Sequence, residues 1–91
     1  MKIVWTKHAG ERQQEWEKKK SITRQEIENV VNSPEQIVPG DMGISIAQTK
    51  TREGLLRVPF LEVAAVRRIL TVYWTSKIER YWKEENYENK I

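Results

Sequence analysis

The chain has 91 residues, contains no cysteine and carries a formal net charge of +3. This composition excludes disulfide bonds and thiolate metal sites, and the length predicts one domain over residues 1–85 with a frayed tail at 86–91. No apolar run has the length of a signal peptide or of a membrane span, so we expect a cytoplasmic protein with no membrane partner. The positive charge suits an acidic partner, either a nucleic acid or an acidic protein.

The N-terminal part is expected to form a short strand at residues 3–5, followed by a helix over 7–19. Thr6 directly precedes this helix, where a threonine side chain accepts hydrogen bonds from the free amides of the first turn. The helix ends in a run of three lysines at 18–20, and cations interact favourably with the carbonyl end of a helix. Its apolar stripe is thin, and most of its surface is polar.

A second helix is the most clearly specified element. The segment Thr23-Arg24-Gln25-Glu26 is a capping box, and Ile22 and Ile27 lie at the positions of a hydrophobic staple around it. The segment Asn32-Ser33-Pro34 is expected to end the helix, because the residue before a proline is disfavoured in the helical conformation.

After this helix the hydrophobic pattern changes from a helical to an alternating period. Three strands are expected, at 44–49, 55–61 and 67–75. Pro39-Gly40-Asp41 has the composition of a turn, and Thr51-Arg52-Glu53-Gly54 that of a hairpin connection. Pro59 predicts that the middle strand lies at an edge or carries a bulge for part of its length.

The strand at 67–75 has two distinct faces. The face expected to lie toward the helices carries Arg68, Leu70, Val72 and Trp74. The opposite face carries Arg67, Ile69, Thr71, Tyr73 and Thr75.

A last helix is expected over 77–85, opened by a second capping box, Ser76-Lys77-Ile78-Glu79. Ile78 and Trp82 lie four residues apart and can dock this helix on the sheet. The predicted order β-α-α-β-β-β-α indicates an α+β fold with an antiparallel sheet and helices packed on one face. The four tryptophans lie at apolar positions, where core packing is their expected use.

His8 and Arg12 are the first candidates for chemistry. They lie one turn apart at the start of the first helix, on the same face. The helix dipole and the Arg12 guanidinium both disfavour the imidazolium form, so His8 is expected to be neutral and able to accept a proton. Free backbone amides and Arg12 would also suit a phosphate. The alternative is structural, with His8 on the surface and Arg12 paired to a nearby glutamate.

The predicted sheet supplies further candidates. Arg57 and Tyr73 are expected to lie on strands, where an arginine and a tyrosine can bind a phosphate and stack on a base. The candidate nucleic-acid-binding residues are Lys7, Arg67, Arg68 and Lys77. An ordinary solvated face is the alternative for these residues. The single histidine and the dispersed glycines predict neither a metal site nor a phosphate loop, and we expect no cofactor.

Several short motifs together resemble a known group of proteins. Thr6-Lys7-His8-Ala9-Gly10-Glu11-Arg12 resembles the HA-x-x-R start of short bacterial and cyanobacterial proteins of unknown function. The resemblance covers about residues 3–75, and its other motifs are Ile22 to Ile27, Val31 to Glu35, Leu56 to Val58 and Leu70 to Tyr73. Those proteins are similar to the RelE/ParE and BrnT toxins of bacterial toxin–antitoxin pairs.

The resemblance implies a small β-α-α-β-β-β fold, RNA cleavage on or off the ribosome, and a neutralising antitoxin protein as partner. Our leading hypothesis is a metal-independent endoribonuclease in which His8 acts as general base or acid and Tyr73 orients or stacks on the RNA. Arg12 and Arg57 would stabilise the phosphate. The sequence departs from the RelE pattern because its histidine lies on the first helix. Two other hypotheses are a non-catalytic module that binds nucleic acid or protein, and a small structural protein.

Overall fold

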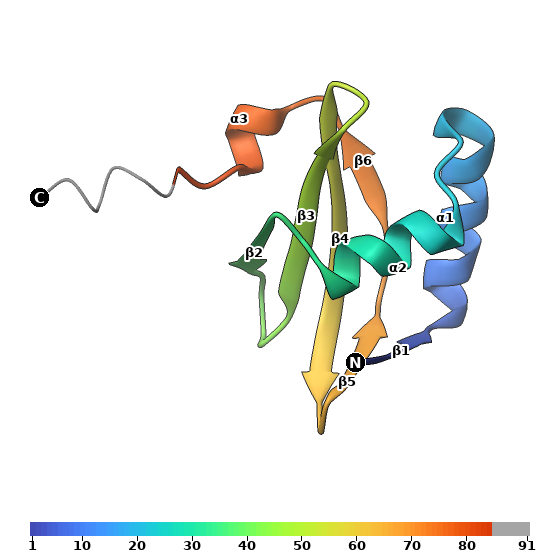
Figure 1. Cartoon of the computed structure of the whole chain (residues 1–91), viewed down its shortest axis with the longest axis vertical. Helices are drawn as coiled ribbons and strands as arrows, with labels where there is room; N and C mark the ends of the chain where they lie inside the picture. The colour runs from blue at the N-terminus through green and yellow to red at the C-terminus, as the bar shows by residue number, and fades with distance from the viewer. Residues whose placement is uncertain (85–91) are drawn as a thin grey trace, which may run out of the picture.

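The computed structural model describes residues 1–84, which form a mixed six-stranded sheet and three helices (Figure 1). The elements in chain order are β1 (Lys2–Trp5), α1 (Lys7–Lys20), α2 (Arg24–Asn32), β2 (Gln36–Pro39), β3 (Ser45–Thr51), β4 (Gly54–Val63), β5 (Val66–Ile69), β6 (Tyr73–Thr75) and α3 (Ile78–Tyr81). The predicted tail at 86–91 lies outside the described residues.

The strands lie in the order β1-β5-β4-β3-β2, and β6 pairs with β4. Neighbouring strands are antiparallel except β1 and β5, which are parallel. The predicted α+β class is therefore confirmed, whereas the sheet is mixed and not wholly antiparallel. The order of elements along the chain does not determine which strands become neighbours, and the predicted order also lacks β2.

The predicted starts of the first two helices are confirmed. The Thr6 Oγ1 atom accepts a hydrogen bond from the Ala9 amide, and Thr23 Oγ1 accepts one from the Glu26 amide, each at 3.1 Å. These bonds satisfy first-turn amides that have no partner within the helix. α2 ends at Asn32, next to the predicted stop signal.

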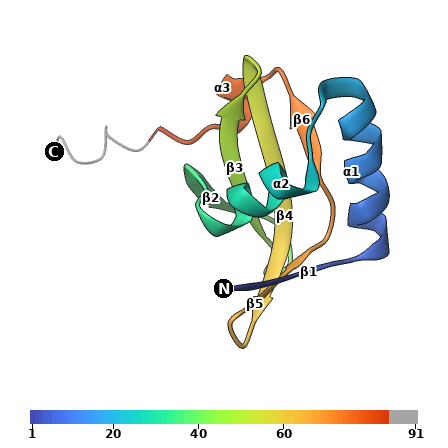
Figure 2. The same cartoon turned by 45° about the vertical axis from the view of Figure 1, so that its right-hand side comes forward.

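The hydrophobic core lies between the sheet and the helices α1 and α2 (Figure 2). Its buried residues are Ala9, Ile22, Ile27, Val30, Val31, Ala47, Leu56, Val58, Phe60, Ile69 and Val72. Trp5, Trp16 and Trp74 pack against this cluster, as predicted. Every second residue of β4 enters the core, so the alternate positions, which include Arg57, lie on the opposite face of the sheet.

α3 lies on this opposite face, so the prediction that all helices share one face is wrong for it (Figure 2). Tyr81 contacts Arg57, and Trp82 lies beneath Lys50 instead of entering the core; Arg57 and Lys50 both point away from α1 and α2. The predicted helix over 77–85 is also too long. α3 has one turn, its N-cap residue makes no capping bond with its side chain, and the predicted capping box does not form.

The predicted strand at 67–75 is divided into β5 and β6. Ile69 and Val72 are 0% and 1% exposed and both enter the core, although they lie three residues apart. A continuous strand alternates its faces every residue, so the break between β5 and β6 shifts the alternation by one position. Val72 and Trp74 face the helices as predicted, whereas Ile69 and Arg67 do so against the prediction.

Pro59 lies in β4, inside the sheet and not in an edge strand. The edge that the proline predicts is a short unpaired stretch on one side of β4. β4 pairs with β3 on one side, and with β6 and then β5 on the other. The Pro59 carbonyl accepts a hydrogen bond from the Leu70 amide at 2.9 Å, so the nitrogen of Pro59 faces the same gap between β6 and β5. The missing N–H therefore falls where no strand pairs with β4.

Ala64 and Ala65 connect β4 to β5 in left-handed conformations, with φ values of 53° and 66°. This conformation costs an alanine roughly 1–2 kcal/mol, whereas glycine adopts it freely. We expect Ala65→Gly to raise the free energy of unfolding by about 1 kcal/mol in urea titrations. The same substitution at Ala47, in the ordinary strand β3, should lower it by about 1 kcal/mol. Equal effects at the two positions would contradict a strained turn.

Arg52, in the turn between β3 and β4, joins the sheet to both large helices. Its guanidinium forms an ion pair with Glu26 at 2.6 Å. It also donates to the carbonyls of Lys20 at 2.8 Å and Ser21 at 3.1 Å, where α1 ends. The hydrogen bond to Glu26 raises the pKa of Arg52, against the opposing effect of desolvation. One side chain thus satisfies carbonyls that a helix end otherwise leaves without partners.

We expect Arg52→Met to lower the free energy of unfolding by about 1–2 kcal/mol, because it removes charge-assisted hydrogen bonds to the ends of two helices. Arg12→Met is the matched control. Arg12 is exposed and pairs with Glu15 along α1, so its loss should change stability by less than about 0.5 kcal/mol. Thermal unfolding of both variants measures the difference, and equal losses would show that Arg52 does not connect the helices.

Candidate functional site

The register of the sheet places three polar side chains in one row on the face opposite the core. Arg57 of β4 lies beside Gln48 of β3 on one side and beside Tyr73 of β6 on the other. Side chains directly opposite each other on neighbouring strands are in contact distance. Arg57 and Tyr73, two of the predicted catalytic residues, are therefore brought together by strand pairing.

Arg57 as a whole residue is 6% exposed, and its guanidinium is held by defined contacts. Its Nε donates to Gln48 Oε1 at 2.8 Å, and its Nη1 donates to the Tyr73 hydroxyl. It stacks on the Tyr81 ring at 4.1 Å, and the rings of Tyr73 and Tyr81 meet edge to face at 6.5 Å. Its Nη2 makes no hydrogen bond within residues 1–84. Since no buried side-chain nitrogen there lacks a partner, Nη2 reaches solvent.

The side-chain amides of Gln36 and Gln48 fix the segment that carries Tyr81. Gln48 Nε2 donates to the Tyr81 carbonyl at 3.2 Å and to Gln36 Oε1 at 2.7 Å. Gln36 in turn accepts from the Lys83 amide at 3.0 Å. We call Gln36, Gln48, Arg57, Tyr73 and Tyr81 the Arg57 cluster. Side chains from β3, β6 and α3 thus contact one guanidinium, and Gln36 of β2 supports them through Gln48 and Lys83.

The charge of Arg57 has no carboxylate to balance it within the described part of the chain. The ion pairs there join Arg12 to Glu15, Arg52 to Glu26, and Arg67 to Glu62. A buried charge without a counter-ion is costly, even when neutral groups satisfy some of its hydrogen bonds. An anion at Nη2 would supply the missing negative charge, and arginine binds phosphate and carboxylate groups well.

The other predicted catalytic residues, His8 and Arg12, lie elsewhere. Both are exposed on α1, which covers the core face of the sheet, and Arg12 pairs with Glu15 at 2.8 Å. The His8 side chain forms no hydrogen bond or ion pair within residues 1–84. The structure therefore does not bring His8 and Arg12 to Arg57 and Tyr73, and the pairing of Arg12 agrees with the structural alternative for that residue.

The four predicted nucleic-acid-binding residues are also spread over the molecule. Arg67 lies on the core side, donates to the Val31 carbonyl at 2.6 Å and stacks on Phe60, so it fastens the end of α2. Lys7 is exposed at the start of α1. Arg68 and Lys77 are exposed, Arg68 on the same face of the sheet as Arg57 and Lys77 just before α3.

Sequence reasoning missed Gln36, Gln48 and Tyr81. Glutamine in a strand carries no clear signal, and β2 itself was not predicted. Gln48 could have been found from the β3–β4 hairpin, because pairing outward from the predicted Thr51–Gly54 turn sets Gln48 opposite Arg57. Tyr81 could not, because α3 lies on the unexpected face of the sheet.

Comparison with known proteins yields no match. No family model matches the chain, and neither a curated protein nor a solved structure is similar enough to match it. Within residues 1–84 no three histidine, cysteine or acidic side chains are grouped as metal ligands, and no helix is long and apolar enough to cross a bilayer.

Proposed function

We propose that the protein binds RNA at the Arg57 cluster and acts as a toxin-like endoribonuclease. The observation that carries this proposal is the nearly buried Arg57 guanidinium, which lacks a carboxylate partner and is framed by two tyrosine rings. A phosphate neutralises such a charge, and tyrosine rings stack on unpaired bases. The sequence resemblance to RelE-like toxins supports the same activity and adds a cognate antitoxin as the proposed partner.

The proposed cleavage needs little more than charge stabilisation and proton transfer. The ribose 2′ oxygen attacks the adjacent phosphorus and loses its proton to water, and the bond from phosphorus to the 5′ oxygen breaks. A 2′,3′-cyclic phosphate forms, and the 5′ oxygen takes up a proton. Arg57 would stabilise the charge that gathers on the phosphate oxygens. The Tyr73 hydroxyl oxygen accepts from Arg57, which leaves its O–H free to donate to the 5′ oxygen. No step is assigned to His8, because α1 lies on the other face of the sheet.

Access of RNA to Arg57 requires Tyr81 to move. α3 has a single turn with no buried residue, and its segment is fixed by the amide bonds to Gln36 and Gln48 and by stacking on Arg57. Segments with few buried apolar contacts open at low free-energy cost. A nucleotide could replace Tyr81 against the guanidinium, with its phosphate at Nη2 and its base against Tyr73.

The proposal is tested by induced expression and by incubation of the purified protein with single-stranded RNA. We expect growth arrest and RNA fragments that end in 2′,3′-cyclic phosphate. RNA binding should weaken with salt, with a log–log slope of about −0.7 for each phosphate bound.

The alternative is a non-catalytic module that binds a protein. It predicts growth effects without RNA fragments and a binding constant that changes little with salt. Intact RNA in both the cell and the purified reaction, with ribosomes present, would exclude the endoribonuclease.

A further inference from the structure

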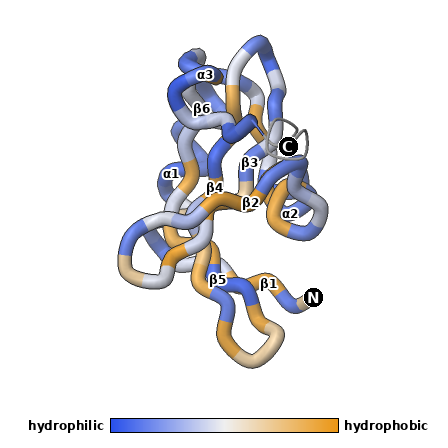
Figure 3. The backbone as a smooth tube through the Cα atoms, turned by 90° about the vertical axis from the view of Figure 1, so that its left-hand side faces the viewer, coloured by the Kyte–Doolittle hydropathy of each residue, from blue (hydrophilic) through white to orange (hydrophobic). Residues whose placement is uncertain are grey.

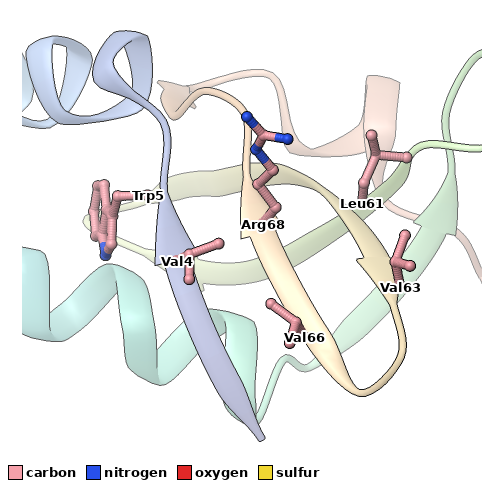
Figure 4. Close-up of a pocket in the computed structure, with 6 residues that line it drawn as sticks. All are labelled: Val4, Trp5, Leu61, Val63, Val66 and Arg68. Carbon is pink, nitrogen blue, oxygen red and sulfur yellow. The ribbon is translucent and has the colours of Figure 1, made fainter.

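We propose that the hollow beside β1 is a docking site for an extended, acidic and aliphatic segment of another protein, which adds to the sheet as a strand next to β1. The hollow, of about 580 Å³, is lined by Val4, Trp5, Leu61, Val63, Val66 and Arg68 (Figure 4). Its residues come from the end of the sheet away from α3, where the connection between β4 and β5 is apolar (Figure 3). This inference does not rest on the proposed RNA cleavage.

The register shows how regular this surface is. One row across the three strands is Lys2, Val66 and Val63, and the next row is Val4, Arg68 and Leu61. Each row therefore contains one cation and two aliphatic side chains, and neither contains an acidic one. Val63 is 70% exposed. Contiguous aliphatic side chains that are exposed to solvent are typical of interaction surfaces.

The edge of β1 supplies the backbone for such a partner. β1 lies at one end of the sheet order and pairs with β5 alone among the strands that the structure describes. An unpaired strand edge presents N–H and C=O groups that accept an added strand. Side chains of that strand would alternate between the two faces, so every second one would lie beside Lys2 or Val4.

The positive charge of this surface favours an acidic protein segment over a second copy of the chain or a nucleic acid. Lys2 and Arg68 form no ion pair within residues 1–84, so the partner segment should carry glutamate or aspartate beside Lys2 and an aliphatic residue beside Val4. A second copy of the chain would place Lys2 and Arg68 of both copies together, and like charges oppose such an interface. A nucleic acid would place charged phosphates against the aliphatic side chains, which is unfavourable because the phosphates would lose hydration.

The test uses a nine-residue peptide in which threonine alternates with glutamate and valine in turn, titrated into ¹⁵N-labelled protein. We expect amide shifts confined to Lys2–Trp5 and Val66–Ile69. A peptide with lysine in place of glutamate should bind at least tenfold more weakly. Arg68→Glu and Val4→Glu should each weaken binding of the glutamate peptide at least tenfold. Met42→Glu, which adds the same charge at a 95% exposed side chain in the turn between β2 and β3, should leave binding unchanged.

Each other outcome overturns the proposal. Equal binding of the two peptides would remove the charge argument, and shifts elsewhere or no shifts would remove the site. A concentration-dependent dimer that Val63→Glu abolishes would assign the hollow to a second copy. Binding to vesicles of anionic lipid that Val63→Glu abolishes would assign it to a membrane surface.

Discussion

Replacing Gly54 with alanine is expected to lower the free energy of unfolding by more than about 3 kcal/mol, a large part of the 5–15 kcal/mol typical of a domain. An added Cβ atom would lie 2.3 Å from Trp74 Cζ2 and 2.5 Å from the Thr75 carbonyl oxygen. Neither neighbour can move freely. The Trp74 indole donates to the Thr51 carbonyl at 3.0 Å, and Thr75 belongs to β6 where it pairs with Leu55.

The matched control is the same substitution at Gly10 in α1. There the nearest atom to an added Cβ is Nη1 of Arg24 at 3.6 Å, an ordinary contact. Alanine favours the helix over glycine, so Gly10→Ala should raise the free energy of unfolding by about 0.5–1 kcal/mol. Urea titration of both variants measures the two changes. If Gly54→Ala costs less than about 1 kcal/mol, Trp74 repacks and β6 is held less firmly than the structure indicates.

The parts of the fold that depend on local chemistry could be predicted from the sequence. Thr6 and Thr23 cap α1 and α2 through bonds that span three residues, and the turn at Thr51–Gly54 joins adjacent strands as expected. Such signals need no knowledge of the rest of the chain.

The parts that depend on strand partners could not be predicted. β2 is four residues long and ends in a proline, Pro39, and pairing with β3 is what makes it a strand. β1 becomes parallel to β5 only through the whole topology. The change of face between Ile69 and Val72 follows from the break between β5 and β6, which pair with different parts of β4. No residue in that stretch predicts the break.

The candidate site divides in the same way. The sequence predicts that Arg57 and Tyr73 both lie on strands. The register of β4 and β6 then makes them neighbours. Their distance from His8 depends on which face of the sheet α1 covers. The alternating pattern of a strand does not show which of its faces a helix covers. Trp74 packs into the core while Tyr73 faces Arg57, so the short strand β6 supports the core on one side and the candidate site on the other.

The Arg57→Gln variant is expected to lose RNA cleavage by a factor of about 10²–10³, the usual effect of removing one preorganised donor from a developing oxyanion. Its stability should hardly fall, because replacing a buried charge that has no ion-pair partner relieves a desolvation cost. The amide nitrogen of glutamine takes the position of Arg57 Nε, so it can still donate to Gln48 Oε1, the buried acceptor. Cleavage rates and urea titrations on the same samples give both numbers.

Arg67→Gln is the matched control, because the same substitution on the core side should have the reverse signature. It removes the bonds to the Val31 carbonyl and to Glu62, so the free energy of unfolding should fall by about 1–2 kcal/mol while cleavage continues in the folded protein. His8→Ala tests the competing site on α1. If His8→Ala abolishes cleavage and Arg57→Gln does not, the reaction takes place on α1 and the Arg57 cluster is structural. If Arg57→Gln loses stability as Arg67→Gln does and keeps full activity, the guanidinium holds α3 in place and binds no phosphate.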